Sequence, residues 1–189
     1  MHIANFDMLD LSKNFFELFG LPVSYTIDDT ALRERYRELQ RTVHPDRYAN
    51  ASQQEQRLAM QGSTFINEAF ETLKDPLKRA QYMLRLLGVD VDSDNETTKD
   101  TAFLMEQLEL REALSEIRYQ ADPLGAIADL LDTVTGKFNR VISDMTTDFE
   151  NPSADRLDAI RERVRKMQFL GKLHREAESL EAELEEELL

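Results

Sequence analysis

The sequence has no cysteine, few glycines and prolines, and no long apolar run. Without cysteine the chain can form no disulfide, carry out no thiol chemistry and offer no thiolate to a metal or cluster. No run approaches the roughly 18 apolar residues that a membrane-spanning helix needs, and the acidic N-terminus lacks the basic-then-apolar layout of a signal peptide. Because there is also little β-branched alternation, sheets are not expected. We therefore expect an all-α, cytoplasmic protein.

Negative charge is concentrated in the second half of the chain. Residues 1–88 hold 11 Lys+Arg against 12 Asp+Glu, a net charge of −1, whereas residues 89–189 hold 12 against 25, a net charge of −13. This charge argues against nucleic acid and anionic membranes as partners, because both would repel it, and it favours a basic protein surface. The stretch 89–100 is rich in Asp, Ser, Asn and Thr and lacks apolar periodicity, so we interpret it as a linker.

Residues 1–88 have the pattern of a small helical domain. Asp28 or Asp29 can cap a first long helix, and Ser52 with Glu55 forms the capping box of a second, which ends at Asp75. Shorter helices are expected before and after this pair. The predicted apolar faces consist of Phe15, Phe16, Leu18, Phe19 and Leu21, then Leu32, Tyr36, Leu39 and Val43, then Leu58, Phe65, Ile66, Ala69, Phe70 and Leu73, and finally Ala80, Met83, Leu84 and Leu87 up to Gly88.

The loop between the two long helices contains His44, Pro45 and Asp46. Pro45 ends the first helix, because the residue before a proline is driven out of the α region and proline has no amide hydrogen to donate. A tripeptide alone is weak evidence, and its structural interpretation is a helix stop followed by an Asp turn. Its position between two long helices favours a functional loop.

Three arginines, Arg33, Arg37 and Arg41, recur every four residues on the first long helix, on a different face from its apolar residues. Such a row can be a solvated surface that keeps a short helix soluble. Next to the His-Pro-Asp loop, a docking surface for an acidic partner is the favoured interpretation.

Residues 101–189 predict three long helices joined by short turns, which together form an antiparallel bundle. The first begins at Thr101, and the second extends from about Pro123 to Phe149. Pro152 is expected in the first turn of the third helix, after a cap at Asn151. The apolar positions of the last two helices are Ile127, Leu130, Leu131, Val134, Phe138, Val141, Ile142 and Met145, and Leu157, Ile160, Val164, Met167, Leu170, Leu173, Ala177, Leu180 and Leu184.

The first helix of this bundle carries more apolar residues than one buried stripe requires. One stripe consists of Phe103, Leu110, Leu114 and Ile117. A second comprises Leu104, Met105 and Leu108, bordered by Glu109, Glu112 and Glu116. Packing against two neighbouring helices would explain the second stripe, and a carboxylate-rimmed binding face for a basic protein is the alternative.

Three segments together resemble the HscB family, the J-type co-chaperones of iron–sulfur cluster assembly. They are Leu18-Phe19-Gly20-Leu21-Pro22, His44-Pro45-Asp46-Arg47, and the run from Asp100 to Glu112. The resemblance covers nearly the whole chain after the first dozen residues. It implies a J domain in residues 1–88, built as an antiparallel helical hairpin with two shorter helices, with residues 1–11 as an extra segment of no assigned role. A C-terminal three-helix bundle in residues 101–189 would follow the linker.

The same resemblance implies two partners, the Hsp70-type chaperone HscA, whose ATPase the J domain stimulates, and the cluster scaffold protein IscU, which the bundle binds. The chaperone-facing residues would be Arg33, Arg37, Arg41, His44, Pro45, Asp46 and Arg47. The scaffold-binding residues would be Leu104, Met105, Leu108, Glu109, Arg111, Glu112, Glu116 and Phe169. Arg47 stands where a lysine is common in the family, a change that keeps the charge. The cysteine motifs of many eukaryotic relatives are absent, which points to a bacterial form.

Two other hypotheses remain open. The chain could be a J-domain co-chaperone for a different Hsp70 client, or an enzyme using His44 and Asp46 as an acid–base pair. The enzyme hypothesis lacks support, because no spacing supplies a nucleophile, a metal site or a phosphate-binding glycine loop, and His2 and His174 are isolated. We therefore predict a non-enzymatic adaptor without cofactor or metal, monomeric when alone.

Overall fold

A computed structural model describes residues 10, 12–89, 98, 100–150 and 152–187, and these form two compact units, Met1–Leu87 and Gly88–Leu189. The described residues contain helices and turns and no strand, so the all-α prediction is confirmed. None of the helices within these ranges is both long and apolar enough to cross a membrane. Most of the extra segment 1–11 and of the expected linker 89–100 lies outside the described residues.

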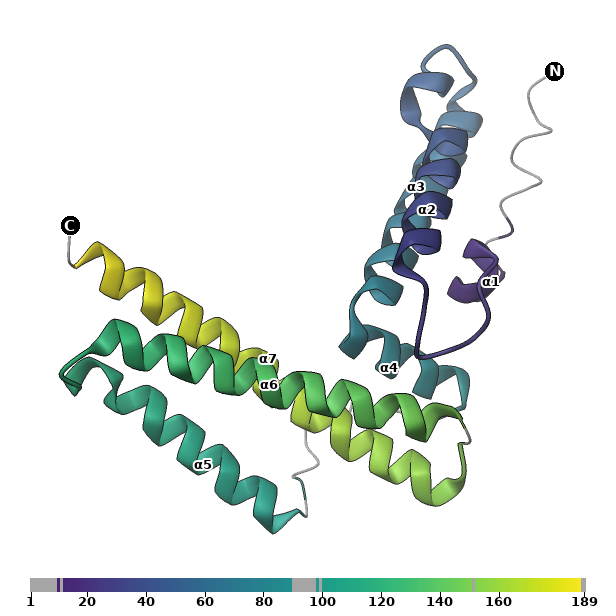
Figure 1. Ribbon diagram of the computed structural model, residues 1–189. Helices are drawn as coiled ribbons and strands as arrows, with labels where there is room; N and C mark the ends of the chain where they lie inside the picture. The colour runs from purple at the N-terminus through teal and green to yellow at the C-terminus, as the bar shows by residue number, and fades with distance from the viewer. Residues whose placement is uncertain (1–9, 11, 90–97, 99, 151, 188–189) are drawn as a thin grey trace. The chain divides into compact units, whose positions relative to one another are not determined.

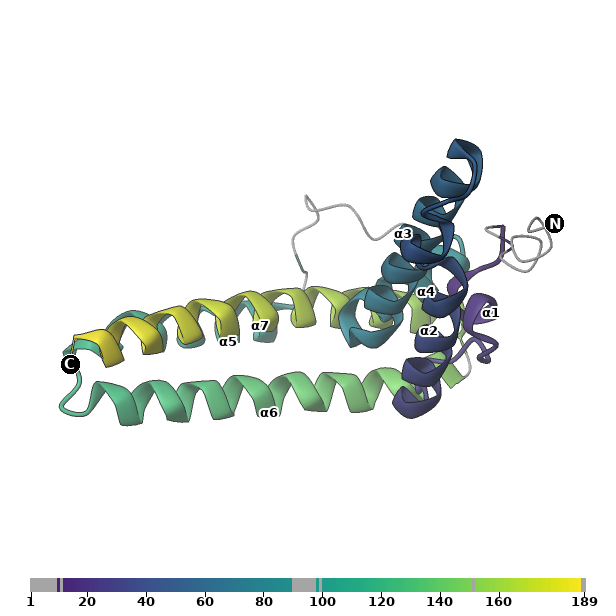
Figure 2. The ribbon, with the colours of Figure 1, turned by 90° about the horizontal axis from the view of Figure 1, so that it is seen from above.

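The first unit, here called the N-terminal unit, is an antiparallel helical hairpin with a shorter helix before it and another after it (Figure 1). The hairpin helices, α2 and α3, lie side by side in both ribbon views (Figure 2). The elements are α1 (Phe15–Phe19), α2 (Asp29–Val43), the 3₁₀ helix η2 (Pro45–Tyr48), α3 (Gln53–Lys74) and α4 (Pro76–Leu86).

Local sequence sets the ends of these helices. Asp28 caps α2 by accepting two first-turn amides, and the capping box of Ser52 and Glu55 opens α3 as predicted. Asp75 has two roles, because it ends α3 and its carboxylate accepts the first amides of α4. Gly20 closes α1 with φ of 65°, a left-handed conformation that strains residues with a Cβ.

Aromatic rings make up much of the packing within the N-terminal unit. Phe15 stacks on Tyr82 with 4.4 Å between ring centroids, and Tyr36 stacks on Phe70 at 4.1 Å. The largest fully buried side chains of this unit are Phe16, Phe19, Leu32, Ile66, Leu73 and Leu84. These rings and aliphatic side chains join all four α-helices of the unit, so the shorter helices are part of the same core.

Two residues expected on apolar faces are exposed. Leu58 is 37% exposed because the inner face of α3 follows the spacing of Ala59, Gly62 and Ile66, which turns the preceding residue toward solvent. Leu87 is 46% exposed because α4 ends at Leu86, so Leu87 is the cap and not part of the helical face.

A buried arginine ties α4 to the rest of the unit. Arg79 donates from Nε to the Leu73 carbonyl oxygen at 2.7 Å and from Nη1 to the Tyr25 carbonyl oxygen at 2.5 Å. Its guanidinium also lies over the Tyr25 ring, 5.5 Å from the centroid. Burial lowers the pKa of Arg79 and raises the pKa of Tyr25 to about 12. The burial of Arg79 was not predicted from the sequence. The signal that could have indicated it is the place of this arginine four residues before the buried Met83, on the same side of the helix.

The second unit is the predicted antiparallel three-helix bundle. It contains α5 (Thr101–Glu116), the short 3₁₀ helix η3 (Ile117–Tyr119), α6 (Pro123–Glu150) and α7 (Ala154–Glu186). The expected start of α7 is wrong: its cap is Ser153, with φ −116° and ψ 166°, and Pro152 precedes it. The Ser153 side chain makes no capping hydrogen bond, and the fixed φ of Pro152 suits an extended segment before a helix. Asn151 lies outside the described residues.

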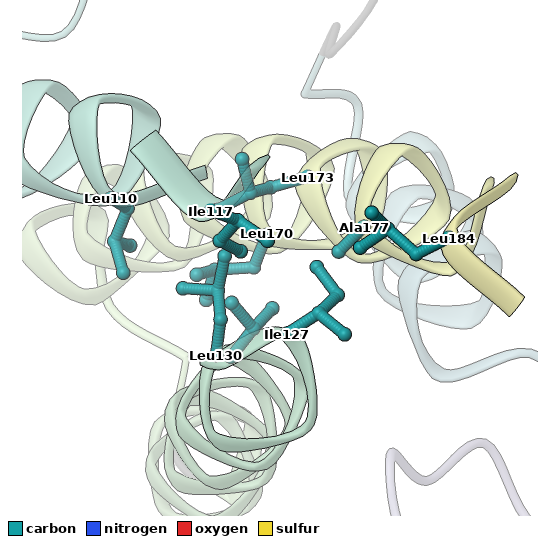
Figure 3. Close-up of a cluster of buried hydrophobic side chains, with 9 residues drawn as sticks. Leu110, Ile117, Ile127, Leu130, Leu170, Leu173, Ala177 and Leu184 are labelled. Atoms are coloured by element: carbon teal, nitrogen blue, oxygen red, sulfur yellow. The ribbon is translucent and has the colours of Figure 1, made fainter. Parts of the chain in front are cut away.

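One cluster of the bundle core is made of buried aliphatic side chains and involves every helix of the unit. Leu110 and Ile117 belong to one cluster with Leu170 and Leu173 of α7 and with Ile127 and Leu130 of α6 (Figure 3). Phe138, Leu114 and Phe169 pack partly buried against this cluster. The buried stripe of α5 is therefore the one predicted, since Phe103, Leu110 and Ile117 are each at most 7% exposed.

Candidate functional site

The His-Pro-Asp loop lies where the hairpin turns. Helix α2 ends at Val43, His44 leaves it with φ −58° and ψ 128°, and η2 begins at Pro45. The Asp46 amide donates to the Nδ1 atom of His44 at 3.3 Å. The Asp46 side chain is 90% exposed, so its carboxylate is available to a partner.

Side-chain bonds to the last turn of α2 hold this loop in place. Arg47 donates from Nη1 to the Arg41 carbonyl oxygen at 2.8 Å, and the buried Tyr48 donates its hydroxyl to the Thr42 carbonyl oxygen at 2.9 Å. These carbonyls belong to the helix terminus and would otherwise need water. Arg47, predicted to face the chaperone, thus also anchors the loop.

His44 and Asp46 do not have the surroundings that a catalytic acid–base pair needs. Nδ1 of His44 lies 3.6 Å from Oδ2 of Asp46, and the same nitrogen accepts the Asp46 amide. Both side chains are more than half exposed, whereas acid–base chemistry needs a site that excludes water.

The arginine row of α2 is exposed along its length. Arg33, Arg37 and Arg41 are all exposed, and no ion pair links them to another of the residues that the structure describes. Three guanidinium groups on the helix leading into the loop therefore leave a positive surface next to one exposed carboxylate. This surface suits a partner with acidic groups and one well-placed cation.

The second apolar stripe of α5 is largely open to solvent. Met105 is 59% exposed and Leu108 is 71% exposed, while Leu104 is half-buried. Packing against a second helix therefore does not account for Met105 or Leu108. We use the name "α5 face" for Leu104, Met105 and Leu108 with the exposed Glu109, Glu112 and Glu116.

Arg111 and Phe169 connect the α5 face to α7. The Arg111 guanidinium lies over the Phe169 ring, 5.6 Å from the centroid, and its Nη1 donates to Glu176 of α7 at 2.7 Å. The Phe169 ring is half-buried and meets Phe103 edge to face, with 5.8 Å between centroids. Arg111 and Phe169, two members of the predicted scaffold-binding set that are distant in sequence, are thus brought to one surface.

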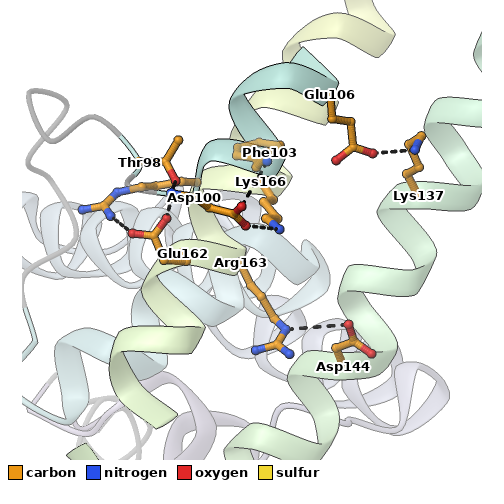
Figure 4. A network of polar contacts seen from close by, with 10 residues as sticks. Thr98, Asp100, Phe103, Glu106, Lys137, Asp144, Glu162, Arg163 and Lys166 are labelled. Atoms are coloured by element: carbon orange, nitrogen blue, oxygen red, sulfur yellow. Dashed lines mark hydrogen bonds and ion pairs between the residues drawn. The ribbon is translucent and has the colours of Figure 1, made fainter. Parts of the chain in front are cut away.

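Polar contacts hold the first turns of α5 against the other two helices (Figure 4). Lys166 donates to Asp100, the cap of α5, at 2.9 Å, and Thr98 donates to Glu162 at 2.6 Å. The hydrogen bond from Lys166, followed by that from the Phe103 amide, holds the pKa of Asp100 below its usual value. A further ion pair joins Glu106 of α5 to Lys137 of α6. Sequence reasoning missed these contacts, because partners on different helices follow no fixed spacing.

No group of three or more His, Cys, Asp or Glu side chains within the described ranges is arranged to hold a metal ion. His174 lies on α7, with Nδ1 3.3 Å from Oε2 of Glu178.

Comparisons with known proteins agree with this geometry. Residues 14–82 match the family described as "DnaJ domain", and residues 99–178 match "HSCB C-terminal oligomerisation domain". The chain is 46% identical over 168 residues to a co-chaperone protein HscB homolog from Shewanella amazonensis, covering 89% of this chain and 97% of the relative.

Solved structures give the same result. The fold superposes on the chaperone HscB from Vibrio cholerae with a TM-score of 0.79 and 37% identity, covering 91% of this chain and 99% of that one. Human HscB gives a TM-score of 0.79 at 29% identity, covering 89% and 82%. A J domain followed by a helical bundle defines a J-type co-chaperone, which is not a known class of enzymes. The chain belongs to the HscB family, whose members are Hsp70 co-chaperones in iron–sulfur cluster assembly.

Proposed function

We propose that this chain is an adaptor that binds the scaffold protein IscU through its bundle and delivers it to the Hsp70-type chaperone HscA. The N-terminal unit stimulates the ATPase of HscA, which aids transfer of the iron–sulfur cluster carried by the scaffold. The adaptor works in the bacterial cytoplasm, as a monomer when alone. The cluster is cargo of the scaffold. The adaptor binds its partners and, by binding, shifts the populations of their conformations.

The observation that carries this proposal is that two chemically different surfaces of one chain are both exposed. Asp46, fixed by the loop contacts of Arg47 and Tyr48, presents a carboxylate that can form a charge-assisted bond with an arginine of the chaperone. The α5 face presents apolar side chains, which in water favour a partner that covers them. Arg33, Arg37 and Arg41 would contribute to encounter and orientation.

The sharpest test separates the two surfaces. Asp46→Asn removes one charge from the loop, and we expect it to reduce ATPase stimulation at least about tenfold, because charge-assisted hydrogen bonds contribute roughly 1.5–3 kcal/mol. Scaffold affinity, measured by titration calorimetry, should not change. Asp129→Asn, the same replacement at an exposed position of α6, is the matched control and should leave both activities intact.

The complementary variant combines Leu104→Ala with Leu108→Ala. We expect it to weaken scaffold binding about a hundredfold, since a few well-packed residues near the centre of an interface contribute most of its affinity. Stimulation of the chaperone's ATPase, measured in the absence of the scaffold, should be unchanged. Val23→Ala, at an apolar residue that is 54% exposed in the N-terminal unit, controls for loss of exposed apolar area. Equal damage to both activities by either variant would contradict the division of roles, and a wild-type chain that fails to bind the scaffold would point to a different Hsp70 client.

A further inference from the structure

Lys172 lies on the side of α7 that borders the α5 face. It follows Phe169 by three residues and precedes Glu176 by four, and residues at these spacings are neighbours on one side of a helix. Phe169 and Glu176 are the two α7 residues that Arg111 of α5 contacts. Lys172 therefore projects from the row of α7 residues that meets α5.

The charge of Lys172 is not neutralised by an ion pair among the residues that the structure describes. Along the same stretch of α7, Lys166 is paired with Asp100 and Arg165 with Glu162, while Arg111 across from it is paired with Glu176. Lys172 is exposed and forms no ion pair with any residue in the described part of the chain. An exposed cation that lacks an ion pair, in a domain of net charge −13, is available to an external anion.

The surface formed by α5 and α7 consequently has charges of opposite sign on its two edges. At about 100° per residue, Glu109 and Arg111 point to opposite sides of the α5 face. Glu112 and Glu116 extend the acidic edge, which faces away from α7. Lys172 marks the basic edge, with the exposed Leu108 between the two.

We propose that Lys172 is a specificity-determining residue of the scaffold-binding surface and receives an acidic side chain of the scaffold. The inference rests on the proposed function, because it takes the scaffold as the occupant of the α5 face. The matching scaffold surface is apolar at its centre, basic where it meets the edge of Glu109, Glu112 and Glu116, and acidic where it meets Lys172. Two edges of opposite sign fix the direction in which the scaffold binds, since the reversed orientation brings like charges together.

The test compares scaffold binding by full-length variants at low and high ionic strength, using a purified IscU-type scaffold and titration calorimetry. Lys172→Ala should weaken binding about threefold, and Lys172→Glu about tenfold because it adds repulsion. Lys172→Arg should retain wild-type affinity. The losses should shrink at high salt, which screens exposed charges.

Arg156→Glu is the matched control. It makes the same change of net charge at an exposed residue of α7 with no ion pair among the described residues, about 24 Å along the helix from Lys172. It should leave affinity within about twofold, since this separation exceeds the screening length. Equal weakening by Arg156→Glu and Lys172→Glu, or unchanged affinity in Lys172→Glu, would overturn the role of Lys172. A wild-type chain that does not bind the scaffold would instead overturn the proposed function.

Discussion

The N-terminal unit and the bundle hold their helices together with different chemistry. In the N-terminal unit the helices meet through stacked aromatic rings and through a buried arginine that donates to backbone carbonyls. In the bundle, a mainly aliphatic core is supplemented by ion pairs between helices at the surface, such as Lys166 with Asp100 and Arg118 with Glu183. The difference matters because buried polar contacts are insensitive to salt, whereas exposed ion pairs are screened.

Loss of the buried arginine should have the largest effect. Arg79→Met keeps much of the side-chain volume but leaves the carbonyls of Leu73 and Tyr25 without their donor, so we expect the N-terminal unit to lose about 3 kcal/mol of unfolding free energy. Near-ultraviolet circular dichroism can follow this unit, since four of the five tyrosines lie within it. Lys78→Met, at an exposed neighbouring position, should change stability by less than about 0.5 kcal/mol. A similar loss in both variants would contradict the importance of the buried contacts.

The second-largest effect should be a loss of stability of the N-terminal unit at alkaline pH. Burial raises the pKa of Tyr25 from 10.0 to about 12 and also raises the pKa of Tyr82. The folded state then holds its proton where the unfolded state has lost it, so the stabilisation is complete below pH 10 and declines as pH rises toward 12, by about 2 kcal/mol for Tyr25. Tyr25→Phe should flatten this decline in denaturant titrations. An equally steep decline in that variant would show that other groups cause it.

The bundle should respond to the opposite end of the pH scale, and more weakly. The pKa of Asp100 is lowered, so its contribution is present above the ordinary value of 3.8 and is lost as pH falls through the lower folded value. Lys166→Met removes the largest cause of this lowering and should reduce the acid sensitivity of the bundle. Thermal unfolding of wild type and variant below pH 4, followed by far-ultraviolet circular dichroism, measures this acid sensitivity. An equal loss of stability per pH unit in the two proteins would argue against the Asp100 contact.

The smallest expected effect is the cost of Lys166→Met at neutral pH. The ion pair with Asp100 is partly exposed, with side chains 29% and 36% accessible, so we expect a small loss of unfolding free energy at low salt and a smaller one at high salt. Part of this loss belongs to the contact of Lys166 with the Phe103 ring, at 5.0 Å. A loss that does not depend on salt would assign the effect to packing.

Much of the architecture could be predicted because its signals are local. The capping box at Ser52, the double role of Asp75 and the helical spacing of apolar residues need only neighbours in sequence. Errors occur at helix ends, where Leu87 and Pro152 fall outside elements they were assigned to. One residue of offset on a helix also suffices to expose Leu58.

The candidate site was predictable in part, for the same reason. The His-Pro-Asp loop and the excess of apolar residues on α5 are visible in the sequence, but periodicity alone could not decide whether Met105 and Leu108 are exposed. The contacts of Arg111 with Phe169 and Glu176 depend on how two distant helices meet, and no local pattern encodes that. The roles of these residues stay predictions until the partners are tested.

The anchoring of the loop by Arg47 and Tyr48 has a consequence for binding. Because both side chains bond to the end of α2, the loop that carries Asp46 already has a defined conformation before any encounter. A preorganised contact loses little conformational entropy on binding, so more of the interaction free energy is left as affinity. A contact centred on one carboxylate and its anchored loop therefore needs little buried area to be effective.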